Sequence, residues 1–182
     1  MTKNFFIIFF VFLFFGVHAN DKKNIIDNLQ KTKNLNFLFE QNINGKIETG
    51  DCIIEFPKKI FCKYQNNNNK ILISNGKSLV IKTLSSYYRY PLKKTPLNII
   101  LDKKILINKI IDLEEKTVDR SYIYYQIKEG NNEINIFFDN KNFNLVGWQT
   151  KDIYQNFNIT LLSSIKINQK VAKNLFKLPP QN

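Results

Sequence analysis

Apolar and polar residues alternate along most of this chain, a pattern that is typical of half-buried β-strands. The longest alternating run is Phe157–Ile167, in which the odd-numbered residues are apolar apart from Ser163. This run predicts one long strand that places Ile159 and Leu161 on its covered side. A shorter run, Leu35–Phe39, predicts another strand near the start of the chain.

Turn residues separate most of the alternating runs by only a few positions. The strongest signal is Asn75–Gly76, because both residue types tolerate the backbone angles of a tight hairpin turn. The predicted hairpins join 46–56 to 60–65, 71–74 to 79–83 and 122–128 to 134–138, and a further turn leads into 145–150. Short connections favour antiparallel neighbours, so we predict about ten strands in antiparallel order.

Two segments have helical spacing instead. Asp21–Lys33 carries an apolar stripe behind an acidic capping residue, and Thr95–Pro96 predicts the N-cap and first turn of a second, short helix. This second helix would present Leu97, Ile100 and Leu101 on one face. A large sheet with one apolar face must curl. The predicted fold is therefore mainly β with α: a curved antiparallel sheet forming an incomplete barrel, its concave apolar face covered by short helices.

The apolar positions assigned to the covered side are long, flexible or aromatic, and no polar group is expected to converge among them. They are Phe37, Phe39, Ile71, Ile73, Ile134, Ile136, Phe138, Trp148, Ile159 and Leu161. Every half-buried strand makes such a set, so the pattern alone favours ordinary core. A cavity for an acyl chain is the alternative, because ligand cavities recur in the mouths of β-barrels.

The first residues have the three parts of a secretory signal peptide. Lys3 is followed by the apolar run Phe5–Phe15, and the small residue Ala19 closes the segment. The run is shorter than the about 20 residues that span a bilayer, which disfavours a membrane anchor. We therefore expect residues 1–19 to be a signal peptide cleaved near Ala19 and residues 20–182 to form one domain.

The chemistry left to the mature chain is narrow. His18, the only histidine, would leave with the signal peptide, which excludes histidine-based nucleophile systems and most metal sites. We expect no catalytic residue, no metal and no cofactor. The net charge of +12 is scattered and carried mostly by lysine, with Arg89 and Arg120 the only arginines. This disfavours nucleic acid as a partner relative to anionic lipid headgroups or an acidic protein.

The two cysteines, Cys52 and Cys62, flank Pro57 at nearly equal distances. Across a hairpin that turns at Pro57 they would lie on neighbouring strands, and exported proteins commonly pair their cysteines. We predict a Cys52–Cys62 disulfide, with two buried free thiols as the alternative. Neither cysteine follows the predicted cleavage site, so we expect no lipid anchor on this chain.

Ordered motifs extend over nearly the whole mature chain. They are the glutamine-ended strand Leu35–Gln41, the proline-ended strand Gly45–Pro57, the aromatic Tyr64, the turn Ser74–Leu79, the helix start Thr95–Leu97 and the terminal Phe176–Pro180. The turn reads Ser-Asn-Gly-Lys-Ser-Leu, and the terminal motif is Phe-x-x-Pro-Pro. In this order and spacing, the motifs resemble those of the LolA family of outer-membrane lipoprotein carrier proteins.

The resemblance implies a monomeric periplasmic carrier that is not an enzyme. Such a carrier takes the acyl chains of lipoproteins from an inner-membrane ABC transporter and passes them to an outer-membrane receptor. A periplasmic sensor or regulatory domain of similar fold, which binds a lipidated or misfolded partner without transport, is the alternative. The implied acyl-chain site adds Phe56, Ile60, Leu97, Ile100 and Leu101 to the apolar set above.

The chain departs from the family pattern at two points. Relatives commonly have an arginine just before the strand-ending proline, where it bonds the covering helices, and another four residues after that proline. Here these positions are Phe56 and Phe61, so Phe56 is interpreted either as core or as an apolar replacement for the latch. The chain also ends two residues after Pro180, where some relatives continue. Without that segment, we expect some association with anionic membranes.

Overall fold

The computed structural model describes residues 18–181 apart from 66–67, 119–120, 131 and 152–155. Most of the predicted signal peptide, including Lys3 and Phe5–Phe15, therefore lies outside the described residues. Its removal stays a prediction. Within the described ranges, no helix has both the length and the apolar character needed to cross a bilayer.

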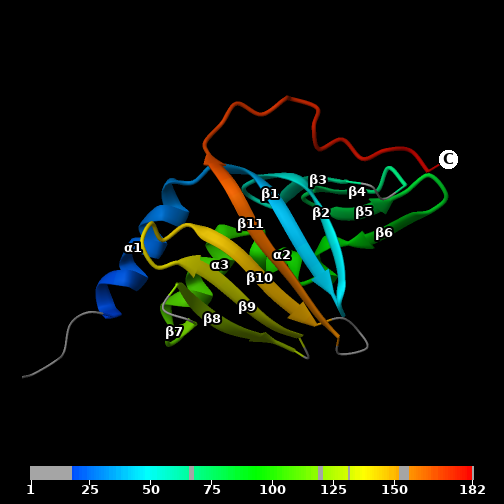
Figure 1. Cartoon of the computed structure of the whole chain (residues 1–182). Coiled ribbons are helices and arrows are strands. Elements are labelled where there is room, and N and C mark those ends of the chain that lie inside the picture. The colour runs from blue at the N-terminus through cyan, green and yellow to red at the C-terminus, as the bar shows by residue number, and fades with distance from the viewer. Residues whose placement is uncertain (1–17, 66–67, 119–120, 131, 152–155, 182) are drawn as a thin grey trace, which may run out of the picture.

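Eleven strands form one antiparallel sheet in the order β6-β5-β4-β3-β2-β1-β11-β10-β9-β8-β7. The strands are β1 (Asn34–Ile43), β2 (Lys46–Glu55), β3 (Lys59–Tyr64), β4 (Ile71–Asn75), β5 (Ser78–Lys82), β6 (Tyr87–Pro91), β7 (Lys116–Val118), β8 (Tyr122–Glu129), β9 (Asn132–Asp139), β10 (Leu145–Lys151) and β11 (Phe157–Ile167). The sheet curves strongly, and across the described strands its outermost members, β6 and β7, do not pair with each other (Figure 1). The predicted mainly β fold with an open, curved sheet is confirmed.

The predicted hairpins are present, and the β4–β5 turn shows why the sequence located them well. Gly76 has a φ angle of +95°, which its missing Cβ permits. Asn75 Oδ1 accepts hydrogen bonds from the N–H groups of Lys77 and Ser78, each at 3.0 Å. The edge strands β6 and β7 were not predicted, because β7 has three residues and β6 lacks alternation.

The pairing of β1 with β11 joins two halves that are each built from sequence neighbours. On one side of β1, Phe37 lies opposite Cys52 of β2, and β3 to β6 follow outward. On the other side, Gln41 lies opposite Thr160 of β11, and β10 to β7 follow outward. Residues 34–43 therefore form the middle of the sheet.

Helices cover the concave side of the sheet, and Figure 1 shows α2 and α3 behind the central strands. They are α1 (His18–Lys31), the 3-10 helix η1 (Leu92–Lys94), α2 (Leu97–Ile100) and α3 (Lys103–Ile111). The predicted short middle helix is α2, whereas α3, which Asp102 caps through the N–H groups of Lys104 and Ile105, was not predicted. The prediction that Thr95 is the N-cap is wrong: Pro96 occupies the N-cap position of α2, and the Thr95 hydroxyl donates to the Leu92 carbonyl at 2.8 Å.

One core lies between the helices and the concave face. The helices contribute Ile25, Leu29, Ile99, Ile100, Leu106 and Ile110. The sheet contributes most of the positions that alternation assigned to the covered side. Phe37, Phe39, Ile134, Ile136 and Phe138 are each at most 4% exposed.

The side of β11 that faces the core was predicted wrongly. Leu161 is 42% exposed and Ile159 only half-buried, whereas Thr160 and Leu162 are buried on the concave side. The cause is an irregularity in the pairing with β1, where β11 has one extra residue near Ser164, whose φ is +51°. Odd-numbered residues before this bulge therefore face outward, whereas Ile165, after the bulge, packs against the core.

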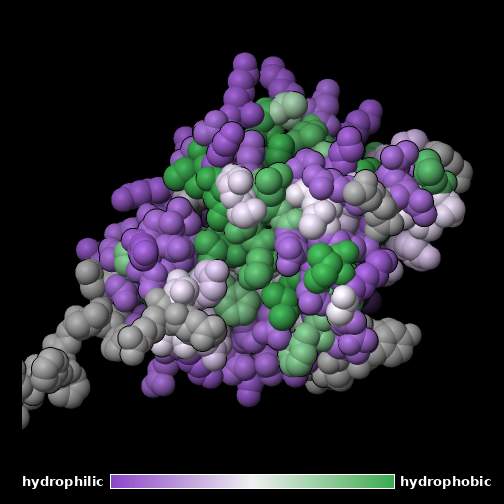
Figure 2. Space-filling model, viewed as in Figure 1, coloured by the Kyte–Doolittle hydropathy of each residue, from purple (hydrophilic) through white to green (hydrophobic). Residues whose placement is uncertain are grey.

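The outer face carries the apolar residues that β11 turns away from the core. Figure 2 shows apolar side chains gathered over the central strands on this side of the molecule. The exposed members include Leu38 of β1 and Phe157 and Leu161 of β11. Because β11 carries apolar residues on its outer face, the assumption that the apolar side of a strand faces the core fails for this strand.

The assignment of Ile71 and Ile73 to the concave side is also wrong. Ile73 pairs with Val80 on the outer face, and both are buried although neither belongs to the main core. The C-terminal segment crosses this face: the Lys82 ammonium donates to the Pro180 carbonyl at 3.1 Å. β4 is thus covered on both sides, so alternation could not identify its inner side.

Candidate binding cavity

A cavity of about 210 Å³ lies between the concave face of the sheet and the turn that begins α2. Its apolar wall consists of Phe39, Cys52, Ile60, Cys62, Leu72, Leu79, Ile81, Pro96, Leu97 and Trp148. Its polar wall consists of Gln41, Tyr64, Thr95, Thr150, Asn158 and Thr160. More open grooves of about 420 and 390 Å³ run along the outer face beside Leu38. The cavity beside α2 is less open to solvent than these grooves and is the candidate site, because ligand sites bury most of the ligand surface.

The disulfide forms part of the apolar wall. Cys52 and Cys62 lie opposite each other on β2 and β3, with their Cα atoms 4.1 Å apart, and the predicted bond between them is confirmed. Gly50 lies two residues earlier on β2, and a Cβ there would come 2.7 Å from the Phe39 ring. Because Gly50 has no side chain, the Phe39 ring can lie directly against β2, and this ring forms part of the cavity wall.

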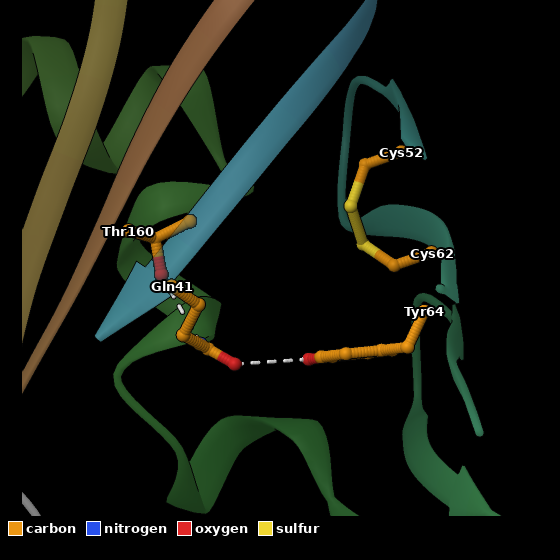
Figure 3. Close-up of a disulfide and its surroundings, with 5 residues drawn as sticks. All are labelled: Gln41, Cys52, Cys62, Tyr64 and Thr160. Atoms are coloured by element: carbon orange, nitrogen blue, oxygen red, sulfur yellow. Dashed lines mark hydrogen bonds between the residues drawn. A yellow bond between two sulfur atoms is a disulfide. The ribbon is translucent and has the colours of Figure 1, made fainter. Parts of the chain in front are cut away.

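A chain of hydrogen bonds forms the polar wall (Figure 3). The Tyr64 hydroxyl donates to Gln41 Oε1 at 3.1 Å, and Gln41 Nε2 donates to Thr160 Oγ1 at 3.2 Å. Together these side chains span β3, β1 and β11, which are separated in sequence and lie near the centre of the sheet. The expectation that no polar group converges on the concave side is therefore wrong.

The sequence contained a signal for this polar wall. Asn158 and Thr160 are even-numbered residues of β11, and the cavity lies on their side of the strand. Because the apolar, odd-numbered residues were assigned to the concave side, Asn158 and Thr160 were not considered as site residues. Gln41 was noticed only as a feature of the family's first strand.

Burial and a nearby ion pair determine the protonation states of Tyr64 and Glu48 at the polar end of the cavity. Burial, with the Glu48 carboxylate as a further cause, raises the pKa of Tyr64 well above its usual range, so its hydroxyl stays a donor at neutral pH. The Lys70 ammonium lies 4.0 Å from the Tyr64 ring centre and pairs with Glu48. Burial alone would raise the pKa of Glu48, but hydrogen bonds from Lys70 and Lys46 outweigh it and hold that pKa below its usual value.

The structure distributes the predicted site residues over three places. Phe39, Ile60, Leu97 and Trp148 line the cavity. The residues buried in the adjoining core are Phe37, Ile100, Leu101, Ile134, Ile136 and Phe138. Those on the outer side of the sheet are Ile71, Ile73, Ile159 and Leu161.

Phe56 does not line the cavity. It is half-buried and packs against the core near Leu29 and Leu35, under α1. The Lys103 ammonium lies 5.9 Å from the centre of its ring. Phe56 thus lies between the core and the covering helices α1 and α3, a position that agrees with both interpretations offered for it.

Charged chemistry is sparse around the cavity. The residues that line it in the described part of the chain carry no ionised side chain. In the part of the chain that the structure describes, no group of three or more His, Cys, Asp or Glu side chains could hold a metal ion. The arrangement offers apolar contact and neutral hydrogen bonds, which suits binding of a neutral amphiphile.

Comparison with known proteins places the chain in a family. Residues 30–179 match the sequence profile described as "Outer membrane lipoprotein carrier protein LolA". The chain belongs to the LolA family. The match covers every strand of the sheet, so the LolA-like fold implied by the sequence motifs is confirmed. No curated protein gives a match.

Solved structures that are similar to the chain share little sequence with it. An uncharacterized conserved protein from Thermus thermophilus has a TM-score of 0.51 at 6% identity, covering 90% of this chain and 95% of its own. A LolA superfamily protein from Nitrosomonas europaea has a TM-score of 0.45 at 10% identity, covering 90% and 99%. LprF from Mycobacterium bovis has a TM-score of 0.44 at 13% identity, covering 85% and 95%.

Proposed function

We propose that this LolA-family protein is a monomeric periplasmic carrier of lipoproteins. It binds the acyl chains of lipoproteins released from the inner membrane by an ABC transporter and delivers them to an outer-membrane receptor. Residues 1–19 are removed during export. The observation that carries the proposal is the largely apolar cavity beneath α2 in a member of this family.

The energetics favour an apolar site covered by a short, movable element. Each CH₂ group removed from water contributes about 0.8 kcal/mol, so acyl chains need a protein surface to cross an aqueous space. The cavity of about 210 Å³ is smaller than the roughly 300–1,000 Å³ of typical ligand pockets. A full acyl chain therefore requires α2, which has four residues, to move away from the sheet.

Contacts around Lys58 and Lys103 hold the covering helices in the absence of the family's arginine. The Lys58 N–H donates to the Leu101 carbonyl at 2.7 Å, and its ammonium lies 3.3 Å from Asp102. Lys103 donates to the carbonyls of Gln30 and Thr32, at 3.0 and 2.8 Å, at the end of α1. Few polar contacts need to break for α2 to move, which suits a carrier that must also release its cargo.

A release assay with matched variants tests the proposal. Inner membranes bearing the transporter are incubated with the mature protein, residues 20–182, and soluble lipoprotein in a one-to-one complex is measured. Leu97→Gln places an amide in the apolar wall and is expected to reduce release by several-fold. Leu161→Gln makes the same change on the outer face and should leave release unchanged.

The outcomes separate the candidate functions. Absence of release by the folded wild-type protein, or equal loss in both variants, would contradict the carrier proposal. Formation of a complex that never passes its lipoprotein to the receptor would instead favour the sensor or regulatory domain.

A further inference from the structure

β11 presents two polar side chains, Asn158 and Thr160, to the cavity. The carboxamide oxygen of Asn158 is buried, and among the described residues no group donates a hydrogen bond to it. A buried acceptor without a donor costs free energy, so buried amides in proteins nearly always have partners. This atom therefore marks a position where a ligand with a donor would be favoured.

The hydrogen-bond chain fixes what Thr160 can offer. Because the Tyr64 hydroxyl donates to Gln41 Oε1, the Gln41 amide is oriented with its Nε2 toward Thr160, where it donates to the hydroxyl oxygen. The Thr160 hydroxyl then has its own hydrogen left to donate. No group in the described part of the chain accepts it, although Thr160 is only 3% exposed.

The two groups are arranged for a ligand that both donates and accepts. Residues two apart on a strand lie roughly 6.6 Å apart on the same face. One amide group, with a hydrogen bond of about 2.9 Å on each side, bridges a gap of that order. The apolar wall begins beside it, where Trp148 lies opposite Thr160 on β10.

We propose that this end of the cavity recognises the secondary amide of an N-acylated peptide. Asn158 Oδ1 accepts a hydrogen bond from the amide N–H, and the Thr160 hydroxyl donates to the amide carbonyl. The acyl chain extends from there along Leu72, Leu79 and Leu97. This inference rests on the proposed carrier function and adds to it the chemical group by which the cargo is selected.

Other head groups fit this arrangement less well. An ester has a carbonyl but no N–H, so it leaves Asn158 Oδ1 without a donor. A free carboxylate brings a charge into a cavity that has no cationic side chain among its described lining residues. The amide is the one common acyl linkage that satisfies both Asn158 and Thr160.

Binding of two probes that differ only at the acyl linkage tests the proposal. N-dodecanoylglycinamide carries the amide, and the dodecanoate ester of glycolamide replaces its N–H by oxygen. Trp148, the only tryptophan of the chain, lines the cavity and reports occupancy by its fluorescence. We expect the amide probe to bind about tenfold more tightly than the ester probe.

Variants assign the selectivity to individual atoms. Asn158→Leu is expected to bring the two affinities within about twofold of each other, since it removes the acceptor. Thr160→Val should weaken both probes by a similar factor and keep their ratio, because both carry the carbonyl. Asn36→Leu is the matched control: its Oδ1 is also buried and without a partner among the described residues, but it borders an outer groove and should leave the ratio at its wild-type value.

Each outcome tests a different part of the proposal. Equal binding of the two probes by the wild-type protein would overturn amide recognition, and this measurement needs no variant to fold. A ratio that survives Asn158→Leu in a folded protein would overturn the assignment to that residue. Failure of both probes to bind would overturn the carrier proposal along with it.

Discussion

The two halves of the sheet bury their inner faces in different ways. In the half beyond β11, the inner side chains of β8 and β9 are closely packed, and Tyr125 and Phe138 are fully buried with their ring centres 6.1 Å apart, while Trp148 and Thr150 of the neighbouring β10 reach the cavity. In the half formed by β2 to β5, Leu72 and Ile81 are only partly buried and border the cavity. The covering helices explain the difference: Leu106 and Ile110 of α3 lie in the solid core, whereas α2 is a single turn.

This comparison indicates that rigidity and binding capacity reside in different parts of the same sheet. A solid half retains its shape when the other half changes. A hollow half can exchange its own contacts for those of a ligand without unfolding the sheet. Variants that separate these two properties follow, from the largest expected effect to the smallest.

The same substitution in each half should differ in its effect on stability. Ile123→Ala in the solid half, where the side chain is 2% exposed, is expected to lower the free energy of unfolding by about 2–5 kcal/mol. Ile81→Ala borders an existing cavity and should lower it by about 1 kcal/mol, while weakening ligand binding. Urea denaturation measures the free energy of unfolding of both variants, and an equal loss of stability in the two would contradict the difference between the halves.

Removal of the disulfide should destabilise the hollow half. The bond closes a loop with a sequence separation of 10, and its loss in the double variant Cys52→Ala/Cys62→Ala is expected to lower the free energy of unfolding by roughly 2–3 kcal/mol. Hydrogen exchange should accelerate in β2 and β3 and remain unchanged in β8 and β9. Uniform acceleration across the sheet would show that the two halves do not behave as separate units.

The Glu48 ion pair should add a smaller, pH-dependent contribution beside the polar end of the cavity. Because the folded pKa of Glu48 lies below its ordinary value of 4.5, the contribution is fully present above that pH. It is lost as the pH falls through the lower, folded pKa. Glu48→Gln is therefore expected to reduce stability by about 1 kcal/mol at pH 7 and to have little effect at the acidic end.

Urea denaturation at a series of pH values checks this prediction. The matched control is Glu55→Gln, whose partner Lys59 is 42% exposed, because exposed pairs contribute little. A pH dependence of stability that is the same for wild-type protein and Glu48→Gln would contradict the assignment.

Local chemistry allowed much of the fold to be predicted. The β4–β5 turn follows from Asn75–Gly76, the Cys52–Cys62 disulfide from a hairpin turning at Pro57, and the extent of β11 from its long run of alternation. These features depend on residues within one hairpin or one strand. For that reason, a single sequence is enough to find them.

The faces of strands and the polar end of the cavity depend on distant parts of the chain. Ile73 is buried on the outer side because a segment about a hundred residues later crosses it, and Leu161 faces outward because of a bulge near Ser164. The contact of Gln41 with Tyr64 and Thr160 joins three strands at once. Alternation records that one side of a strand is apolar, but it does not record what covers either side.

The pairing of β1 with β11 also governs how the sheet is assembled in time. Every other neighbouring pair consists of strands that are consecutive in the chain, so most of these pairs need only short loops to close. The central pair joins Leu35 to Ile167, and its formation requires closure of most of the polypeptide. We therefore expect the two halves to form early and the central seam to form last, as the rate-limiting step. Until Phe157–Ile167 is available, one edge of β1 remains open to any other strand, and this edge is where an incompletely synthesised chain is most exposed to misassembly.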